Sequence, residues 1–140
     1  MQIFLPYPDF NKSVACLDKS RLGNQIWREC KTLLNGGWKH HPVAKMWKDY
    51  HAAMALYGIA GVQELLRRND ISQIKAHELC DYFCQFCTHV DGPMPPFIGN
   101  VHFHKSHRLN LLYKDPTWYR QFFNDPIPQT KPEYIWPIPK

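Results

Sequence analysis

Residues 42–68 read PVAKMWKDYHAAMALYGIAGVQELLRR, and this stretch indicates the fold class of the chain. Its apolar residues recur every three or four positions, as they do along one face of an α-helix. They are Val43, Met46, Trp47, Tyr50, Met54, Tyr57, Val62, Leu65 and Leu66. Pro42 suits the first turn of a helix, because its missing N–H loses no hydrogen bond there. We predict a central helix of about seven turns from Pro42 to Arg68.

The segment before this stretch predicts another long helix. Apolar residues follow helical spacing from Ser13 to Leu34, and Gly23 interrupts the pattern, so a kink is expected. The sequence Asn35-Gly36-Gly37 is typical of a helix C-terminus, because glycine readily adopts the left-handed conformation. The opening MQIFLPYPDF is extended and interrupted by proline, and we expect it to lie across the surface of the domain.

The C-terminal half predicts shorter helices and an extended tail. Residues 74–87 and 106–113 follow helical spacing, with the rigid loop DGPMPPF between them. Asp115 followed by Pro116 is typical of an N-cap and a first helical residue, and it starts the short helix TWYRQFF. The ending NDPIPQTKPEYIWPIPK has too many prolines for a helix or a central strand, so it suggests an extended strap. We predict an all-α fold, one compact helical domain over residues 1–140 with extended N-terminal and Pro-rich C-terminal segments.

Length and composition limit the class of protein. A chain of 140 residues with 44% hydrophobic residues can bury one sizeable core. The formal charge of +5 with many Trp and Tyr residues is compatible with nucleic acid, and also with a soluble basic enzyme. There is no uncharged apolar run of about 18 residues and no signal-peptide pattern, so we expect an intracellular protein without a membrane span. The odd count of five cysteines favours reduced thiols over a disulfide framework.

The segment HELCDYFCQFCTH is rich in side chains that bind zinc. These side chains are His77, Cys80, Cys84, Cys87 and His89. The three cysteines also share helical spacing with Phe83, and small cysteines at such positions ordinarily pack in a core. One helical face does not surround a metal tetrahedrally without a ligand from elsewhere. We therefore favour core packing and expect no metal, with a zinc protein as an alternative.

Two clusters combine histidine with lysine or arginine beside a predicted helix start. The first comprises Trp38, Lys39, His40 and His41, with Lys45 and Lys48 further along. The second comprises His102, His104, Lys105, Ser106, His107 and Arg108. A helix N-terminus attracts phosphate, and cations and hydroxyls contact DNA backbones, so we interpret both clusters as contacts to duplex DNA. The alternative for the first cluster is that one imidazole caps the helix start and the other is solvated.

Charged residues also stand out on the predicted helix 13–34. Arg21 and Arg28 are seven residues apart and would share a face, while Glu29 would lie about a hundred degrees round from Arg28. A charge on a helix is most often simply solvated. Asp18 has the further explanation that it pairs with Arg21 one turn later.

Taken in order, four motifs resemble the pyrimidine-dimer DNA glycosylase family. They are LDKSRLGNQIWRE, GGWKHHPVAKMW, FHKSHRLNLLYKDPTWY and the YIWP of the tail. Trp27-Arg28-Glu29 resembles a Tyr-Arg-Glu triplet found in the family, and Pro116-Thr117-Trp118-Tyr119 resembles a Pro-Thr-Trp-Tyr sequence near its C-terminus. The resemblance covers most of the chain as a pattern rather than as close identity.

The resemblance implies a mostly helical enzyme that bends duplex DNA, flips a base and cuts the glycosidic bond of a damaged pyrimidine, with no cofactor. Glu29 matches the family's essential glutamate, which would stabilise positive charge developing on the sugar. Arg21 and Arg28 would hold phosphates beside the target. The aromatic residues that could stack on an extruded base, or fill its place, are Trp38, Trp118 and Tyr119.

In that family a free N-terminal amine attacks the sugar C1′, and the resulting imine undergoes β-elimination, which is AP-lyase chemistry. Here Gln2 follows Met1, and so large a side chain normally prevents removal of the methionine, so the nucleophile would be the Met1 amine, or water would attack instead. Asp18 is the alternative key carboxylate. The expected partner is duplex DNA with a damaged or modified pyrimidine, bound by a monomer in the cytoplasm of a bacterial or phage-infected cell. A non-catalytic DNA-binding protein is the alternative function.

Overall fold

The computed structural model describes residues 2–87 and 93–137. Within these ranges the structure contains helices and no β-strands. The elements are α1 (Phe10–Ala15), α2 (Lys19–Asn24), the π-helical turn η1 (Gln25–Glu29), α3 (Cys30–Leu34), α4 (Pro42–Trp47), α5 (His51–Arg67), α6 (Gln73–Cys84), α7 (Val101–Lys114) and α8 (Pro116–Tyr119). The predicted all-α class is therefore confirmed. Part of the predicted DGPMPPF loop and His89 lie outside the described residues.

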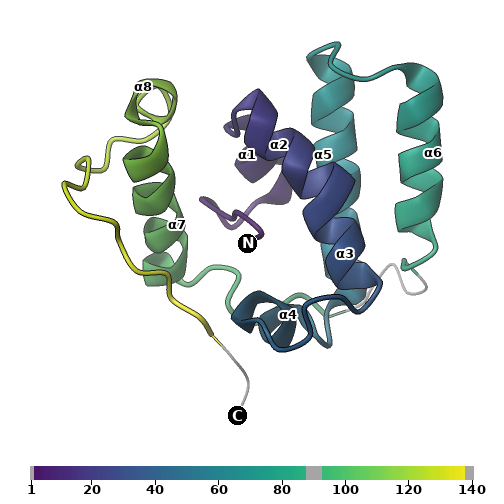
Figure 1. Cartoon of the computed structure of the whole chain (residues 1–140), viewed down its shortest axis with the longest axis horizontal. Coiled ribbons are helices and arrows are strands. Elements are labelled where there is room, and N and C mark those ends of the chain that lie inside the picture. The colour runs from purple at the N-terminus through teal and green to yellow at the C-terminus, as the bar shows by residue number, and fades with distance from the viewer. Residues whose placement is uncertain (1, 88–92, 138–140) are drawn as a thin grey trace.

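Helix α5 is the centre of the fold, with α6 on one side and the run from α1 to α3 on the other (Figure 1). Its Met54, Tyr57 and Val62 side chains are fully buried. The prediction of one helix from Pro42 to Arg68 is wrong, because the chain turns after Trp47 and starts again at His51. The apolar residues keep their helical spacing across that turn. Their spacing alone therefore does not show that the helix ends and a second one begins in another direction.

The predicted helix from Ser13 to Leu34 is also interrupted. The break follows α1, and the Asp18 side chain caps the new start at α2 by accepting a hydrogen bond from the Arg21 amide at 3.3 Å. Sequence reasoning considered this carboxylate as an ion-pair partner and missed its role as an N-cap. Gly23 lies inside α2 and ends nothing.

Residues 2–6 of the N-terminal segment are buried, so the expectation that the segment lies across the surface is wrong for this part. Ile3 and Leu5 have no exposed surface, and the segment runs between α7 and the α2–α3 run (Figure 1). Side chains satisfy its backbone: the Phe4 amide donates to Gln25 Oε1 at 2.9 Å, and the Leu5 amide donates to His107 Nδ1 at 2.8 Å. Because these bonds replace those of a helix or sheet, an extended apolar segment can lie inside the fold.

The later helices follow their predictions with shifted ends. Helix α6 ends three residues before the predicted Cys87, and α8 has the predicted cap, in which Asp115 Oδ1 accepts from the Trp118 amide at 3.1 Å. Helix α7 begins five residues earlier than predicted, because Asn100 caps its start. Apolar spacing did not reveal the first turns of α7, because the inward positions there are occupied by the polar side chains His104 and His107.

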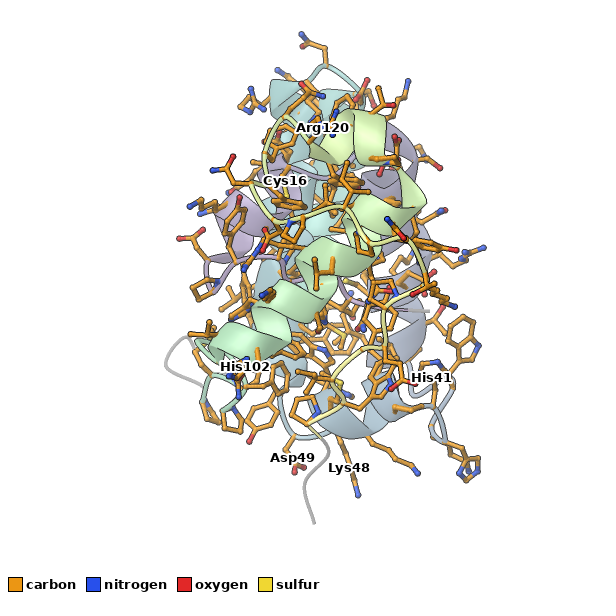
Figure 2. All side chains as sticks on the ribbon, turned by 90° about the vertical axis from the view of Figure 1, so that its left-hand side faces the viewer. Cys16, His41, Lys48, Asp49, His102 and Arg120 are labelled. Carbon is orange, nitrogen blue, oxygen red and sulfur yellow. The ribbon has the colours of Figure 1, made fainter. Side chains whose placement is uncertain are left out.

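The C-terminal tail is extended as far as Pro137, as predicted for a strap. It crosses α7 and runs down toward the end of the molecule where His41 lies (Figure 2). Aromatic contacts hold it: the Tyr134 ring lies 5.6 Å from the His107 ring, and the Trp136 ring lies 5.7 Å from the His41 ring, centroid to centroid. In the part of the chain that the structure describes, no helix is long and apolar enough to cross a membrane.

Candidate active site

A pocket of about 270 Å³ opens where the N-terminal segment, α2, η1, the end of α7 and the C-terminal strap meet. Its lining residues are Gln2, Phe4, Arg21, Asn24, Gln25, Glu29, Lys114, Lys131 and Tyr134. We refer to it as the Glu29 pocket. It combines three cationic side chains with one carboxylate, and these come from segments far apart in the sequence.

Glu29 is a buried carboxylate, with only 5% of its surface exposed. Its Oε1 accepts from Arg28 Nε at 3.3 Å and from Arg28 Nη2 at 3.2 Å. Its Oε2 is buried and has no hydrogen-bond partner among the described residues. A buried, unsatisfied carboxylate oxygen costs free energy, so its presence beside a pocket marks a place for a donor or a positive charge from a ligand.

The π-helical turn η1 determines which charges face the pocket. The Cys30 amide donates to the Gln25 carbonyl five residues back, so this turn is wider than that of an α-helix. The extra residue brings Arg21 and Glu29 to one pocket and leaves the Arg28 side chain 64% exposed. The prediction that Arg21 and Arg28 share a face, which assumed a regular α-helix, is therefore wrong.

Asp18, the alternative carboxylate, is not among the residues that line the pocket. Its Oδ1 accepts from Arg21 Nη1 at 3.1 Å, and the Tyr119 hydroxyl donates to the same oxygen. Burial alone would raise the pKa of Asp18, but the bonds from Tyr119 and Arg21 outweigh it, so the pKa is lowered. Asp18 therefore caps α2 and holds Arg21, and Glu29 is the carboxylate that lines the pocket.

Two lysines of the pocket were missed by sequence reasoning. Lys114, at the end of α7, places its Nζ 5.3 Å from the centre of the Phe4 ring and 6.0 Å from that of Tyr134. Burial lowers the pKa of Lys114, and the charges of Arg21 and Lys131 lower it further. Lys114 lies in the motif FHKSHRLNLLYKDPTWY but was not singled out there, and Lys131 lies in no motif. Only the folded chain brings the tail against α7.

Gln25 was also missed, and it fastens the N-terminal segment to the site. Its Nε2 donates to the Gln2 carbonyl at 2.8 Å, while its Oε1 accepts from the Phe4 amide at 2.9 Å and from the Tyr57 hydroxyl at 3.2 Å. The segment is therefore held one helical turn from Glu29. Met1, the predicted nucleophile, lies outside the described residues.

The first histidine cluster lies on the surface. Lys39, His40 and Lys45 are exposed, and they line a second pocket of about 480 Å³. Its lining residues are Leu33, Gly36, Gly37, Lys39, His40, Ala44, Lys45, Lys48 and His51. We refer to it as the Lys45 pocket, and Lys48 projects from this end of the molecule (Figure 2).

Within this cluster His41 caps the start of a helix, in agreement with the alternative interpretation of one imidazole. Its Nδ1 accepts from the Val43 amide at 3.1 Å, at the start of α4. Burial lowers the pKa of His41, and the negative charge of Glu29 opposes that shift. Trp38 has a positive φ of 54° and is 47% exposed, so its ring is available on the surface.

Most of the second histidine cluster points inward, because α7 begins at Val101 and His104, Ser106 and His107 lie along its buried face, whereas His102 is exposed. His104 Nε2 accepts from the Gly99 amide at 2.8 Å, and its Nδ1 lies 2.7 Å from the Leu5 carbonyl. His107 is fully buried. Ser106 donates to the Phe103 carbonyl, and Arg108 pairs with Asp125 and with the Pro6 carbonyl.

His104, His107 and Arg108 hold the N-terminal segment or the tail against α7, and Ser106 bonds within α7 itself. The geometry therefore gives no support to a DNA contact by any of these four side chains. Lys105 remains exposed. The same holds for the two predicted stacking residues of α8: Tyr119 is fully buried, and the half-buried Trp118 donates its Nε1–H to the Cys16 carbonyl at 2.8 Å.

The cysteine prediction is wrong for Cys84, which is exposed, and Cys80 and Cys87 are only partly buried. The buried face of α6 is formed by Ala76, Leu79 and Phe83, about a quarter turn away from the cysteines. Within residues 2–87 and 93–137 there is no group of three or more His, Cys, Asp or Glu side chains that could hold a metal ion.

Comparison with known proteins adds to this geometry. No curated protein and no solved structure gives a significant match to the chain. The sequence profile of one family, described as pyrimidine dimer DNA glycosylase, matches residues 1–84. The match includes the N-terminal segment, η1 with Glu29, and the Lys45 pocket, and it stops before α7 and the strap. Because it spans 84 of the 140 residues, the chain belongs to the pyrimidine dimer DNA glycosylase family.

Proposed function

We propose that the protein excises damaged or modified pyrimidines, ultraviolet-induced dimers among them, from duplex DNA, and that Glu29 is its catalytic carboxylate. The observation that carries the proposal is the buried Glu29 with an unsatisfied oxygen in a cationic pocket. Cleavage of a glycosidic bond builds positive charge on the sugar. A fixed carboxylate in a water-poor site stabilises that charge more than water does.

Burial of Glu29 also supports extrusion of the target nucleotide. A base stacked in a duplex cannot reach a carboxylate that is 5% exposed, so the nucleotide has to leave the stack and enter the pocket. Arg21, Lys114 and Lys131 line the pocket and would bind the phosphates on either side of the extruded sugar. The cost of flipping is a few kcal/mol, and it is lower for a damaged base, which favours damaged sites.

The duplex on either side would be held by exposed groups on the same side of η1 and α3. Arg28 is the group nearest to Glu29, to which it bonds. Lys39, His40 and Lys45 extend the positive surface over the Lys45 pocket. Trp38 is the exposed aromatic side chain that could fill the space of the extruded base. Proteins that neutralise phosphates in this way bind DNA with a strong dependence on salt.

We further propose AP-lyase activity with the Met1 amine as nucleophile. The support is the position of Gln2, whose carbonyl is bonded to Gln25 and whose side chain lines the Glu29 pocket. The neutral amine would attack C1′, and the base would leave with the electron pair of the glycosidic bond and a proton. Opening of the sugar ring then gives an imine, and loss of the C2′ proton expels the 3′ phosphate by β-elimination.

The main test is Glu29→Gln, assayed on an irradiated duplex and on an undamaged one. We expect base release to fall by more than a hundredfold while DNA affinity stays within about threefold, because the carboxylate acts on the transition state. Glu78→Gln is the matched control, since Glu78 lies on α6 in an exposed ion pair with Lys75. Full activity of Glu29→Gln would refute the assignment. Binding without cleavage by the wild type, across a panel of modified pyrimidines, would favour the non-catalytic DNA-binding alternative.

The nucleophile is tested separately with borohydride, which reduces an imine to a stable cross-link. Mass spectrometry first establishes that Met1 is present and unmodified. Trapping on the active substrate, followed by proteolysis, should then give a cross-link confined to the N-terminal peptide. Base release without any trapped adduct would show that water attacks and that the protein is a simple glycosylase. A cross-link on the Lys114 peptide would assign the reaction to a different amine.

A further inference from the structure

Arg21, which lines the Glu29 pocket, is held by a carboxylate. Its Nη1 donates to Asp18 Oδ1 at 3.1 Å, and the two side chains are 27% and 14% exposed. Burial lowers the pKa of Lys114, and the charge of Arg21 lowers it further, so the guanidinium lies near this lysine of the same pocket. A guanidinium carries several N–H donors, so Arg21 keeps donors for an anion while it bonds to Asp18.

Asp18 is itself fixed through both of its oxygens. Oδ2 accepts from the Arg21 backbone amide at 3.3 Å, as the N-cap of α2. Oδ1 accepts from the Tyr119 hydroxyl as well as from the Arg21 side chain. A carboxylate bonded through both oxygens cannot rotate freely, and it therefore directs the guanidinium that it binds.

Tyr119 is the rigid end of this arrangement. Its ring has no exposed surface and stacks on Phe123, with the centroids 5.7 Å apart and the planes at 8°. Its hydroxyl also accepts from the Asp18 amide at 3.2 Å, so it contacts both the backbone and the side chain of Asp18. Burial raises the pKa of Tyr119, and the bond to Asp18 raises it further, so the hydroxyl keeps its proton.

We propose that Asp18 and Tyr119 are positioning residues, which hold Arg21 in the orientation that binds a DNA backbone phosphate next to the sugar at Glu29. This inference rests on the proposed glycosylase function. A long arginine side chain has many rotamers, and a phosphate bound to a mobile guanidinium would move with it. Misplacement of a reacting group by about 1 Å can slow a reaction about a hundredfold, so the support of Arg21 acts on the chemical step.

The charge of Asp18 separates this role from simple attraction of DNA. Burial would raise the pKa of Asp18, but the bonds from Tyr119 and Arg21 outweigh it, so the carboxylate is ionised. A negative charge beside Arg21 weakens the long-range attraction between the protein and a polyanion. Loss of that charge should therefore leave DNA binding at least as strong, while base release slows.

The main test is Asp18→Asn, made in the wild type and in Arg21→Gln. Asparagine caps a helix about as well as aspartate, so α2 keeps its start while the ion pair is lost. Tyr119→Phe removes the hydroxyl and keeps the stacked ring. Asp125→Asn is the matched control, because Asp125 pairs with Arg108 at 2.9 Å in a similarly buried ion pair, and neither residue lines the Glu29 pocket.

Each variant is assayed for single-turnover base release from a dimer-containing duplex and for affinity to an undamaged duplex. Thermal melting establishes that the assays run on folded protein. We expect Asp18→Asn to slow base release about tenfold and Tyr119→Phe about threefold, with duplex affinity equal to the wild type or higher. In Arg21→Gln the same Asp18→Asn change should have no further effect, because Asp18 acts through Arg21. Asp125→Asn should release base at the wild-type rate.

Two results would overturn the inference and leave the proposed function intact. One is base release at the wild-type rate by Asp18→Asn. The other is an undiminished loss when Asp18→Asn is made in Arg21→Gln, because Asp18 would then act independently of the arginine. Base release at the wild-type rate by Tyr119→Phe would overturn the role of the tyrosine. A wild type that releases no base would refute the proposed function itself, and this inference with it.

Discussion

The turn that carries Trp38 to His41 and the part of α7 that carries His104 to His107 contain nearly the same kinds of side chain in opposite surroundings. In the turn, Lys39 and His40 are solvated beside the open Lys45 pocket. On α7 the two histidines are buried and bond to the backbone of Leu5. Histidine and lysine beside a helix start are therefore as compatible with an internal support as with a phosphate contact.

The difference arises from what each cluster packs against. In the turn, Trp136 of the strap packs against His41, but Lys39 and His40 are exposed, so these two side chains stay free to bind an anion. The α7 cluster faces an extended segment whose amides and carbonyls lack partners of their own, and imidazole can serve both, as acceptor through one nitrogen and donor through the other. Four predictions separate the two roles, from the largest expected effect to the smallest.

The largest effect should come from His107→Ala. The substitution leaves the Leu5 amide without its acceptor and opens a cavity beside Phe103 and Tyr134, so we expect a loss of about 3 kcal/mol in unfolding free energy. Melting would fall by about 10 °C for a chain of this size. His40→Ala, the exposed counterpart, should stay within about 0.5 kcal/mol of the wild type by urea titration. Equal stability of the two variants would break the comparison.

The second prediction concerns acid. Burial lowers the pKa of His107 to about 3, and the pKa of His104 is lowered in the same direction, also mainly by burial. Unfolded histidines bind protons below about pH 6.5 and the folded ones do not, so stability should decrease as the pH falls from 7 to 5. The decrease should approach about 1.4 kcal/mol per pH unit for His107 alone.

The window between pH 5 and 6.5 isolates these histidines from the carboxylates. Asp18 and Glu64 have lowered pKa values, so the stability that they contribute is lost only as the pH falls below their ordinary values near 4. Urea unfolding at pH 7, 6 and 5 provides the measurement. A stability that is flat over this range would mean that His107 is protonated inside the fold.

The third prediction concerns the exposed cluster. Lys39→Ala and Lys45→Ala should each reduce the slope of log affinity against log salt by about 0.9, because each would remove one phosphate contact, and melting should not change. Lys75→Ala is the control, since that lysine lies on α6 in an exposed pair with Glu78. A slope unchanged by Lys39→Ala and Lys45→Ala would exclude the Lys45 pocket from the DNA interface.

The smallest effect is expected for Lys105→Ala. Lys105 is the exposed member of the otherwise inward part of α7, so stability should change by less than about 0.5 kcal/mol. It does not line the Glu29 pocket, and we expect base release within twofold of the wild type. A tenfold loss of DNA affinity in Lys105→Ala would show that the DNA interface includes α7. It would contradict the proposed difference between the two clusters.

Elements with strong local signals could be predicted from the sequence. Asp115 with Pro116 gave the start of α8 because capping and the proline φ angle are local properties. Glu29 was singled out through a short motif, and the structure places it at a pocket. The π-helical turn could not be foreseen, because one extra residue in a turn leaves the apolar pattern almost unchanged. Arg21 and Arg28 were therefore wrongly assigned to one face.

The rest of the site depends on contacts between distant segments. Lys114 and Tyr134 lie in motifs of the resemblance and Lys131 does not, but neither motif predicts a contact with Glu29, which all three approach only when the tail folds back. Gln25 looks like an ordinary helical residue until the N-terminal segment lies beside it. Periodicity reports which residues face inward, and it does not report which segment they face.

The buried N-terminal segment has a consequence for synthesis on the ribosome. Leu5 is made early, yet the imidazole that accepts from its amide is 102 residues later in the chain, and Tyr134 comes later still. At bacterial or eukaryotic elongation rates of about 5 to 20 residues per second, this segment waits about 5 to 20 s for its partner. Until then the apolar N-terminal segment stays exposed to solvent, and chaperones bind exposed apolar segments. The Glu29 pocket can be completed only after Tyr134 has emerged.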